Sequence, residues 1–465
     1  MVLRLMIDPH IFRAYDIRGR AHTQITEGAC ELVGRAFGSV LRERYRKDHP
    51  TVAVGRDART HGQELERAVC KGLMEAGCNL FLIGETPSPV NYFTICNRKL
   101  DGGVQVTASH NPAADNGLKL QLRDAQAFAG EDLQDLRQRI EKKQFFSGVG
   151  SEEFVDSETP YVERLLSMFS DVGRGLSIVI DGGNGVAGKL YADIVRKTGA
   201  KVFELYTEPD GTFPHHAADP SKWETLTDLQ ATVLKTKANA GFAFDGDGDR
   251  LGIVDERGRI RSADDILLLL AEEHLRKEPG GKIVFTVSNS GVLETEIRKW
   301  GGVPVMRKVG HSFVEHAMRE NGALLGGEQS GHFFCFDNYY GFDDALAAAL
   351  HVLNILSKRN EPLSKILGTY PKVFQTPEKR PHCPDDKKSD VIRRVTEHFS
   401  KTHPVLSLDG ARIDFGEGAW AGIRQSNTSP CLSICIEART EKKRGEVEEV
   451  VLEHLRKYPE ITWEE

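Results

Sequence analysis

One pattern of hydrophobic and polar positions occurs three times along the chain. Each copy begins with an apolar segment, passes through a polar or glycine-rich turn into a helical stretch, and ends with a glycine and a second apolar segment. This is the order of a βαβ unit. Because the apolar segments are uninterrupted, we predict mostly parallel sheets covered by helices on both faces. The predicted strand pairs are 51–54 with 79–83, 176–180 with 201–205, and 282–285 with 303–306.

The pattern changes after Leu367. Four prolines stand in a polar stretch between residues 371 and 384, which is typical of a linker or an extended strand. Beyond it, the order of elements is that of an α+β domain. The predicted elements are a helix near 390–400, strands at 411–415, 419–423 and 431–437, and a closing helix at 441–457.

These patterns predict an α/β protein of three similar mixed α/β domains followed by a smaller α+β C-terminal domain. Such a number of domains suits a chain of 465 residues. The expected boundaries are 1–153, 154–256, 257–369 and 370–465.

Composition limits the function classes. A net charge of −7 gives no basic field for nucleic acid or an anionic membrane, so we expect small-molecule partners and local phosphate binding. The eight cysteines include no CxxC pair, which favours reduced structural thiols over a zinc site. Charged residues interrupt the first twenty positions, so no signal peptide is evident and we expect a cytoplasmic protein.

The most informative segment is 245–250, which reads Asp-Gly-Asp-Gly-Asp-Arg. Glycines between the acids allow Asp245, Asp247 and Asp249 to converge, and three carboxylates at one point favour Mg²⁺ or Ca²⁺. Arg250 beside them can pair with the acids or with a phosphate. Solvated acids on a loop and an EF-hand completed by Glu256 are the alternatives, but the flanks are strand-like and Arg250 stands where an EF-hand needs glycine.

A second segment, 107–112, follows an apolar strand and reads Thr-Ala-Ser-His-Asn-Pro. A strand-to-loop junction is where α/β proteins place ligands and nucleophiles, so Ser109 is a candidate nucleophile. A polar turn is the alternative. Lys119, ten residues further on, is a possible acid or base, although such a lysine is more often on the surface.

Two further loops carry polar groups. In 326–332, Glu328, Ser330 and His332 offer an acceptor, a hydroxyl and a titratable ring, a combination that suits sugar hydroxyls. In 424–430, Arg424 stands among hydroxyl and amide donors, which favours a phosphate site. Each could also be a polar turn. The segment 183–188 matches the dinucleotide pattern GxGxxG, but a close strand-to-helix turn explains its glycines equally well.

Taken together, these loops resemble the α-D-phosphohexomutase superfamily over essentially the whole chain, most closely its bacterial phosphomannomutase/phosphoglucomutases. The matching stretches are 15–19, 107–112 with 115–119, 245–250, 310–312, 327–332 and 424–428.

The resemblance implies four domains around one central cleft and an enzyme that interconverts hexose 1-phosphate and hexose 6-phosphate. Ser109 would carry a phosphoryl group, and a hexose 1,6-bisphosphate would be the intermediate and activator. One Mg²⁺ would be held by Ser109, Asp245, Asp247 and Asp249. Catalysis would fall to Ser109, Lys119, Arg18, Arg250 and His332. Substrate binding would involve Tyr15, His311, Glu328, Gln329, Ser330, Gly331, His332, Arg424, Gln425, Ser426, Asn427 and Thr428.

Three positions depart from the common mannose/glucose pattern. Gln329 replaces a frequent methionine, Ser288 stands where a sugar-contacting lysine is common, and Asp265 replaces a common arginine. The stretch Gly-Glu-Gln-Ser-Gly-His at 327–332 also occurs in phosphoglucosamine mutases, which keeps that substrate open. A non-catalytic Ca²⁺ or sugar-phosphate binding protein and an NAD-linked oxidoreductase are alternatives from other classes. We expect a monomer or a dimer.

Overall fold

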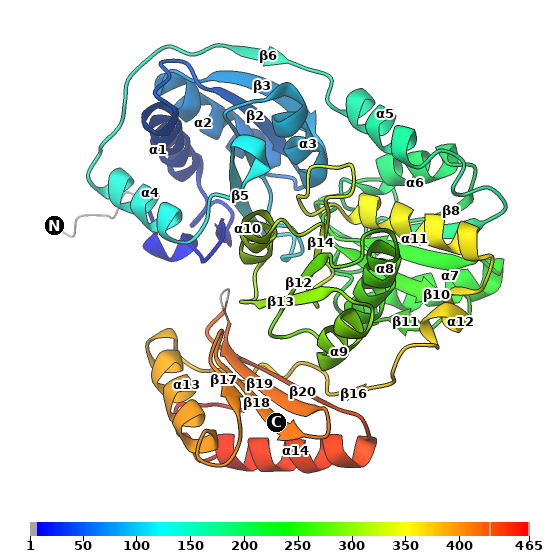
Figure 1. Ribbon diagram of the computed structural model, residues 1–465. Helices are drawn as coiled ribbons and strands as arrows, with labels where there is room; N and C mark the ends of the chain where they lie inside the picture. Colours follow the sequence, from blue (N-terminus) through cyan, green and yellow to red (C-terminus); the bar gives the residue numbers. More distant parts are fainter. Residues whose placement is uncertain (1–6, 427–428, 464–465) are drawn as a thin grey trace. The chain divides into compact units, whose positions relative to one another are not determined.

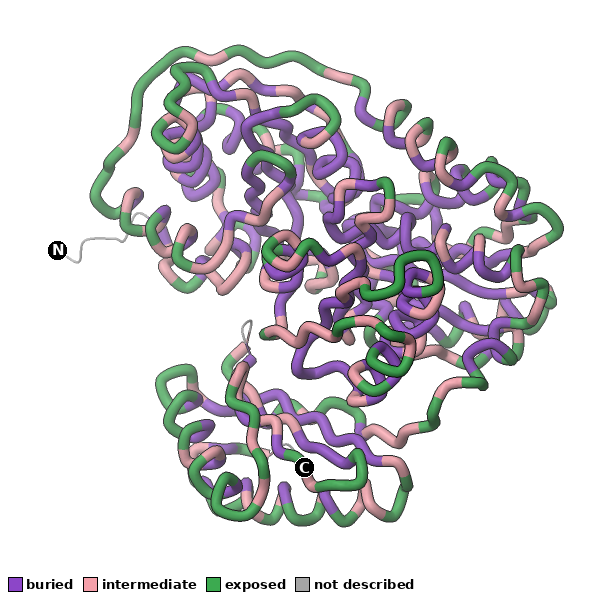
Figure 2. The backbone as a smooth tube through the Cα atoms, viewed as in Figure 1, coloured by how far each residue is buried: buried purple, intermediate pink, exposed green. Residues whose placement is uncertain are grey.

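The computed structural model describes residues 7–426 and 429–463. The chain forms two compact units. The first runs as far as Ile266 and resumes with Ser330–Ile366, and the second contains Leu267–Gln329 and the chain from Leu367 onward. Figure 1 labels the elements, and Figure 2 shows that the buried backbone of each unit follows its strands and the inner faces of its helices.

In the first unit, the first sheet has the strand order β1-β5-β4-β2-β3-β6. The predicted pair β2 and β3 is parallel, and β4 and β6 extend the parallel set. Strand β5 pairs antiparallel with β4, and β1 pairs antiparallel with β5. The sheet is therefore mixed. Its elements are η1 Pro9–Ile11, β1 Ile17–Arg20, α1 Glu27–Tyr45, β2 Thr51–Arg56, α2 Gly62–Glu75, β3 Asn79–Glu85, α3 Ser88–Arg98, β4 Gly102–Val106, β5 Asp115–Leu122, η2 Arg123–Ala125, α4 Glu131–Glu141 and β6 Glu152–Phe154.

Helices cover both faces of the first sheet. A Cβ on Gly102 would meet Leu41 of α1, and a Cβ on the next residue, Gly103, would meet Ile95 of α3. Because successive strand residues point to opposite faces, α1 and α3 lie on opposite sides. This arrangement matches the helix-covered sheet expected from uninterrupted apolar strands.

The second sheet has the order β11-β10-β9-β7-β8. Strands β7, β8 and β9 are parallel, and β9 turns back into the antiparallel β10. Its elements are α5 Glu158–Met168, β7 Ser177–Asp181, α6 Gly188–Lys197, β8 Lys201–Leu205, η3 Trp223–Leu226, α7 Thr227–Thr236, β9 Ala240–Phe244, β10 Leu251–Asp255 and β11 Ile260–Arg261.

The chain leaves the first unit within α8 and returns to it after β14. In the second unit, β12 pairs in parallel with both β13 and β14, as predicted for the third βαβ copy. The elements of this stretch are α8 Ala263–Lys277, β12 Lys282–Thr286, α9 Gly291–Lys299, β13 Val303–Arg307, α10 His311–Asn321 and β14 Leu325–Gly327. After the chain returns to the first unit, it forms β15 Phe333–Cys335 and α11 Ala345–Arg359, and α12 Leu363–Leu367 ends at the unit boundary.

The fourth sheet is antiparallel, with the order β16-β20-β19-β18-β17. Its apolar side chains join those of α13 and α14 in one core, so both helices cover the same face. In Figure 1 these are the orange and red elements. They are β16 Phe374–Gln375, α13 Asp385–Phe399, β17 Val405–Leu406, β18 Ala411–Gly416, β19 Ala419–Gln425, β20 Leu432–Ala438 and α14 Glu441–Leu455.

Two sequence expectations need correction. The sheets are more mixed than predicted, because each of the first two adds antiparallel strands to its parallel core. The helix expected near 390–400 begins earlier, at Asp385, because Pro384 and the acids at 385 and 386 form a helix start.

The eight cysteines are free thiols. Among the described residues, no helix is long and apolar enough to cross a bilayer.

A pair of stacked histidines predicts a pH-dependent stability in the second unit. The rings of His398 and His454 lie 3.8 Å apart, and burial together with the neighbouring His398 lowers the pKa of His454 to about 4. The unfolded chain, with an ordinary pKa near 6.5, therefore binds this proton first as the pH falls. We expect the melting temperature to fall from about pH 6.5 toward pH 4. His454→Gln should flatten that dependence, and the exposed His316→Gln should leave it unchanged.

Candidate active site

Ser109 lies in a strained turn directly after β4. Its φ is +50°, in the left-handed region, and its residue is 1% exposed. The amide of Ser109 donates to Thr107 Oγ1 at 2.8 Å, and its hydroxyl donates to Asp245 Oδ2 at 2.6 Å. His110 Nδ1 lies 3.2 Å from the same hydroxyl. The candidate nucleophile is thus held against residues 245–250, which we call the acid loop.

The acid loop joins two antiparallel strands, β9 and β10. Asp245 Oδ1 accepts hydrogen bonds of 3.0–3.1 Å from the amides of Gly248, Asp249 and Arg250, which fold the loop around this carboxylate. A Cβ on Gly246 would lie 2.5 Å from the carbonyl oxygen of Ser109, so only glycine allows the two loops to approach this closely. Flanking strands also exclude the EF-hand alternative, which requires helices.

Lys119, on β5, neutralises part of the acid cluster. Its ammonium donates to Asp247 Oδ2 at 2.6 Å and to Asp249 Oδ2. Burial opposes the charge, but the two carboxylates outweigh it and raise the pKa of Lys119 well above its usual value. The sequence could not distinguish this lysine from a surface residue, and the structure places it 3% exposed.

The three buried carboxylates of the acid loop lie close enough to repel one another. Burial and the charges of Asp249 and Asp247 raise the pKa of Asp245 well above its usual value. One oxygen from each acid lies within 4.8 Å of the others, and Asp247 Oδ1 has no hydrogen-bond partner among the described residues. This set of hard oxygen donors fits a divalent cation such as Mg²⁺.

His332 holds Arg250. Arg250 Nε donates to His332 Nε2 at 3.0 Å, and a guanidinium cannot accept, so the imidazole proton is on Nδ1. That nitrogen lies 2.9 Å from Asp343 Oδ2 and 3.6 Å from Asp249 Oδ1. On its other side, Arg250 Nη1 lies 3.7 Å from Asp219. His332 therefore orients the arginine.

Backbone pairing brings His332 to this place. The Leu251 amide donates to the Gly331 carbonyl at 3.0 Å, and Gly331 has a φ of +94° where a Cβ would meet that strand. The adjoining Ser330 also belongs to the first unit. Two predicted substrate residues, Gly331 and His332, are therefore tied to the acid loop and the strand that follows it.

Arg18 and Tyr15 precede or begin β1 in the same unit. Arg18 Nε lies 2.6 Å from Asp16, and its Nη1 donates to the Ala108 carbonyl at 3.2 Å and to Asn111 Oδ1 at 3.1 Å. Arg18 thus contacts the loop between β4 and β5, residues 107–114, which we call the serine loop. Tyr15 is partly buried.

The structure adds residues that sequence reasoning missed. Ser88, at the start of α3, donates to Asp247 Oδ2 at 2.5 Å. Asp57 and Arg59 form a buried pair under the serine loop, and Asp343 contacts His332. Their only sequence signal is their place after or beside predicted strands, so proximity in the fold was needed to find them.

The remaining predicted residues lie in the second unit. Glu328 Oε1 accepts from the Gly310 amide at 2.7 Å, immediately before His311 at the start of α10. Gln329 Oε1 lies 4.0 Å from the thiol of Cys435. Of the loop predicted to hold a sugar, Glu328 and Gln329 thus lie in the second unit.

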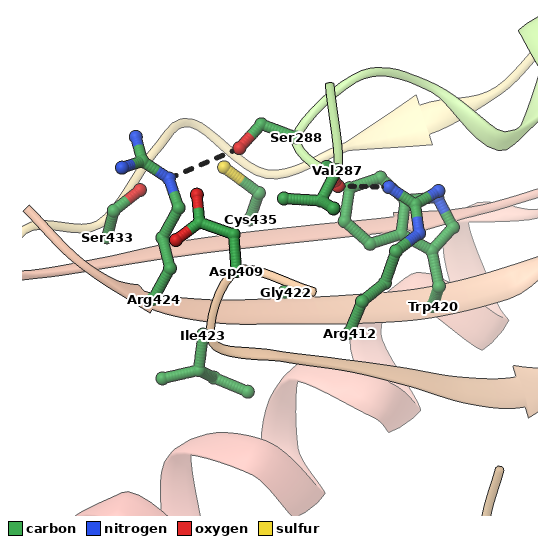
Figure 3. Close-up of a pocket in the computed structure, with 10 residues that line it drawn as sticks. All are labelled: Val287, Ser288, Asp409, Arg412, Trp420, Gly422, Ile423, Arg424, Ser433 and Cys435. Atoms are coloured by element: carbon green, nitrogen blue, oxygen red, sulfur yellow. Dashed lines mark hydrogen bonds between the residues drawn. The ribbon is translucent and has the colours of Figure 1, made fainter. Parts of the chain in front are cut away.

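A pocket in the second unit contains the predicted phosphate arginine. Alternation along β18, β19 and β20 turns apolar residues toward the helices and polar ones to the other face. In Figure 3, Arg424 reaches Ser288, with a distance of 3.3 Å from Nε to Oγ, and Arg412 lies over the Trp420 ring. The lining residues are Val287, Ser288, Asp409, Arg412, Trp420, Gly422, Ile423, Arg424, Ser433 and Cys435.

The loop after Arg424 is only partly described. Gln425 Oε1 accepts from Ser389, and Ser426 Oγ accepts from Arg380 at 3.0 Å. Predicted residues Asn427 and Thr428 lie outside the described residues. The guanidinium of Arg380 and the hydroxyl of Ser389 therefore contact the loop that follows Arg424.

Comparison with known proteins identifies four consecutive domains. Family models match, in chain order, phosphoglucomutase/phosphomannomutase alpha/beta/alpha domain I at residues 9–147, domain II at 159–258, domain III at 262–374 and the C-terminal domain at 378–454. The predicted fold class is confirmed.

Relatives and a solved structure agree with these matches. The chain is 38% identical to the phosphomannomutase/phosphoglucomutase of Pseudomonas aeruginosa, covering 96% of this chain and 95% of that one. It is 36% identical to a phosphoglucomutase of Neisseria gonorrhoeae, covering 97% and 98%. A crystal structure of a phosphoglucomutase/phosphomannomutase family protein from Burkholderia thailandensis matches with a TM-score of 0.91, 37% identity and coverage of 98% and 100%.

The acid cluster predicts that a divalent cation stabilises the protein. Mg²⁺ at about 100 times its dissociation constant should add roughly 2.7 kcal/mol to the free energy of unfolding and raise the melting temperature. Asp247→Asn removes one charged ligand and should abolish most of that shift. Thermal unfolding with and without Mg²⁺ measures it. Asp193→Asn, an exposed acid on α6, should keep the full shift; equal shifts in both variants would contradict the site.

Proposed function

Because the chain belongs to the phosphoglucomutase/phosphomannomutase family, we propose that it interconverts hexose 1-phosphate and hexose 6-phosphate, using mannose and glucose phosphates. The supporting observation is the Ser109 hydroxyl, held 2.6 Å from Asp245 within a buried acid cluster. A strained serine beside three carboxylates, Lys119 and Arg250 suits phosphoryl transfer.

The reaction would proceed in two transfers. The P–O bond to Ser109 Oγ breaks as the free sugar hydroxyl forms a new P–O bond, giving a hexose 1,6-bisphosphate. The proton lost by the sugar hydroxyl returns to Ser109 Oγ. After the bisphosphate turns around, its other phosphoryl group passes back to Ser109, and no external acceptor is needed.

Positive charge is the main requirement of this transfer. Mg²⁺, held by Ser109, Asp245, Asp247 and Asp249, would supply charge stabilisation at the transferring group. Arg250 would add a guanidinium whose direction is fixed by His332. The cations around the cluster, Lys119 included, would favour the ionised forms of Asp247 and Asp249, whose pKa values lie below their usual range.

Proton transfer would fall to Lys119 among the three candidates. Arg18 has a guanidinium, which stays protonated in proteins. His332 Nε2 already accepts from Arg250, so this ring serves the arginine. Lys119 carries its proton inside the cluster, and its ammonium would be the group of the three that gives and takes back a proton.

The remaining predicted residues would bind the rest of the substrate. Glu328, Gln329 and Ser330 would hold sugar hydroxyls, and His311 lies beside Glu328 at the start of its helix. Arg424 would bind the phosphate that is not reacting, since a guanidinium offers several charge-assisted hydrogen bonds. Tyr15, Gly331, Gln425, Ser426, Asn427 and Thr428 would complete the binding loops. We propose a cytoplasmic monomer or dimer.

Phosphorylation of Ser109 tests the mechanism. Incubation with glucose 1,6-bisphosphate should add one phosphoryl group that peptide mapping assigns to Ser109. Ser109→Ala should lower kcat by several orders of magnitude, on the order of the 10⁶-fold seen when a covalent nucleophile is removed, while the circular dichroism spectrum stays unchanged. Ser151→Ala, a surface serine, is the control. Near-normal turnover without Ser109 would refute the role.

Substrate specificity tests the choice among sugars. We expect turnover of both glucose 1-phosphate and mannose 1-phosphate, with glucosamine 1-phosphate poorer. The highest kcat/KM for glucosamine 1-phosphate would instead support a phosphoglucosamine mutase, the reading that Gln329 keeps open.

The phosphate role of Arg424 has its own test. Arg424→Ala loses charge-assisted hydrogen bonds of roughly 1.5–3 kcal/mol, so binding of both hexose phosphates should weaken by similar factors, about 10- to 150-fold. Isothermal titration measures both affinities. Arg393→Ala, on the exposed side of α13, should leave both unchanged. A change in the ratio of the two affinities would contradict a pure phosphate contact.

A further inference from the structure

Arg59 is a buried arginine under the serine loop, just beyond β2. The residue is 2% exposed, and its side chain is completely covered. A guanidinium has five N–H donors, and here each one meets an acceptor. Nε donates to Asp57 Oδ2 at 3.1 Å, and the other four donate at 2.7–2.8 Å to the main-chain carbonyls of Ser109, Asn111, Pro112 and Asp115.

The four carbonyls lie between residues 109 and 115, from the serine loop to the first residue of β5. One planar cation therefore fixes the direction of four peptide groups and closes the loop between β4 and β5. Lysine could not do this, because an ammonium is a point charge with three donors and no planar fork.

Asp57 extends the network to the amide of Ser109. Its Oδ2 also accepts from Thr107 Oγ1 at 2.6 Å, so the hydroxyl proton of Thr107 points toward this carboxylate. The lone pairs of Thr107 Oγ1 are then available to accept the Ser109 amide at 2.8 Å. Both the N–H and the C=O of Ser109 are thus tied to the Asp57–Arg59 pair.

This double attachment explains how Ser109 keeps an unfavourable backbone. A serine with a φ of +50° is strained and persists only where surrounding contacts over-determine it. The resulting turn directs the hydroxyl to Asp245. Arg59 itself has its donors occupied and its side chain covered, so it does not reach substrate.

We propose that Arg59 is a positioning residue for phosphoryl transfer, acting with Asp57 and Thr107 through the backbone of the serine loop. The proposal rests on the proposed mutase function. It requires that damage to the network lowers kcat, because Ser109 is displaced, and leaves KM for the sugar phosphate nearly unchanged, because the proposed sugar and phosphate contacts lie elsewhere.

Two matched pairs of variants test this role. Thr107→Val keeps the shape of the side chain but removes the bridging hydroxyl, whereas Thr107→Ser restores it. Arg59→Lys keeps the charge but loses the planar fork. Its control is Arg56→Lys at the end of β2, where the arginine pairs with Glu66 and Glu85 instead of the serine loop.

We expect kcat with glucose 1-phosphate to fall on the order of 100-fold in Thr107→Val and Arg59→Lys, the cost of a small misplacement of a reacting group. In Thr107→Ser and Arg56→Lys, kcat should stay within about threefold of the value for the unsubstituted protein. KM should change little in all four. Melting temperatures identify any variant that fails to fold.

Hydrogen exchange supplies a readout that does not depend on turnover. Peptides covering 107–116 should exchange faster in Thr107→Val and Arg59→Lys than in their partners. If the unsubstituted protein shows no mutase activity, the proposed function fails, and exchange still decides whether the network holds the loop. Unchanged exchange, a rise in KM at constant kcat, or a Thr107→Ser variant as impaired as Thr107→Val would overturn the positioning role.

Discussion

The first unit depends on burying three carboxylates at one point. Isolated charges removed from water cost many kcal/mol, so they persist only where cations and hydrogen bonds surround them. Lys119 supplies a cation from the first sheet to Asp247 and Asp249 on the second. Ser88 adds a hydroxyl and an amide to Asp247 from α3. The acid loop is therefore also where the two sheets of this unit are bonded together.

The strands could be predicted because their signal is local. Uninterrupted apolar segments followed by a turn, a helix and a glycine placed β2, β3, β7, β8, β12 and β13 within one or two residues. The convergence of the acids was also local, since glycines alternate with them. The antiparallel additions to each sheet depend on which distant segment reaches an edge, and no short-range pattern carries that information.

The missing parts of the candidate site are those that act across the fold. Arg59 follows a predicted strand by five residues, but its four main-chain acceptors lie fifty or more positions further along the chain. Asp343 reaches His332 because an antiparallel backbone bridge between Phe334 and Asp343 folds the intervening segment back. In the fourth sheet, by contrast, the alternation that buries Ile423 already requires Arg424 to point away from the core. A sequence predicts the face of a side chain better than its partner.

Charge balance links the state of Ser109 to the cation proposed for the acid cluster. In the unphosphorylated chain, the Ser109 hydroxyl donates a hydrogen bond to Asp245, while the Lys119 ammonium pairs with Asp247 and the Arg250 guanidinium lies against Asp219. A phosphoryl group on Ser109 removes that donor and adds nearly two negative charges beside the three carboxylates. The side chains already present cannot offset this, because their cations are engaged with the acids. Phosphorylation must therefore strengthen the binding of a divalent cation, and by reciprocity a bound cation must stabilise the phosphorylated serine by the same free energy. Under the proposed function, this coupling favours an enzyme that stays phosphorylated on Ser109 until a sugar hydroxyl binds.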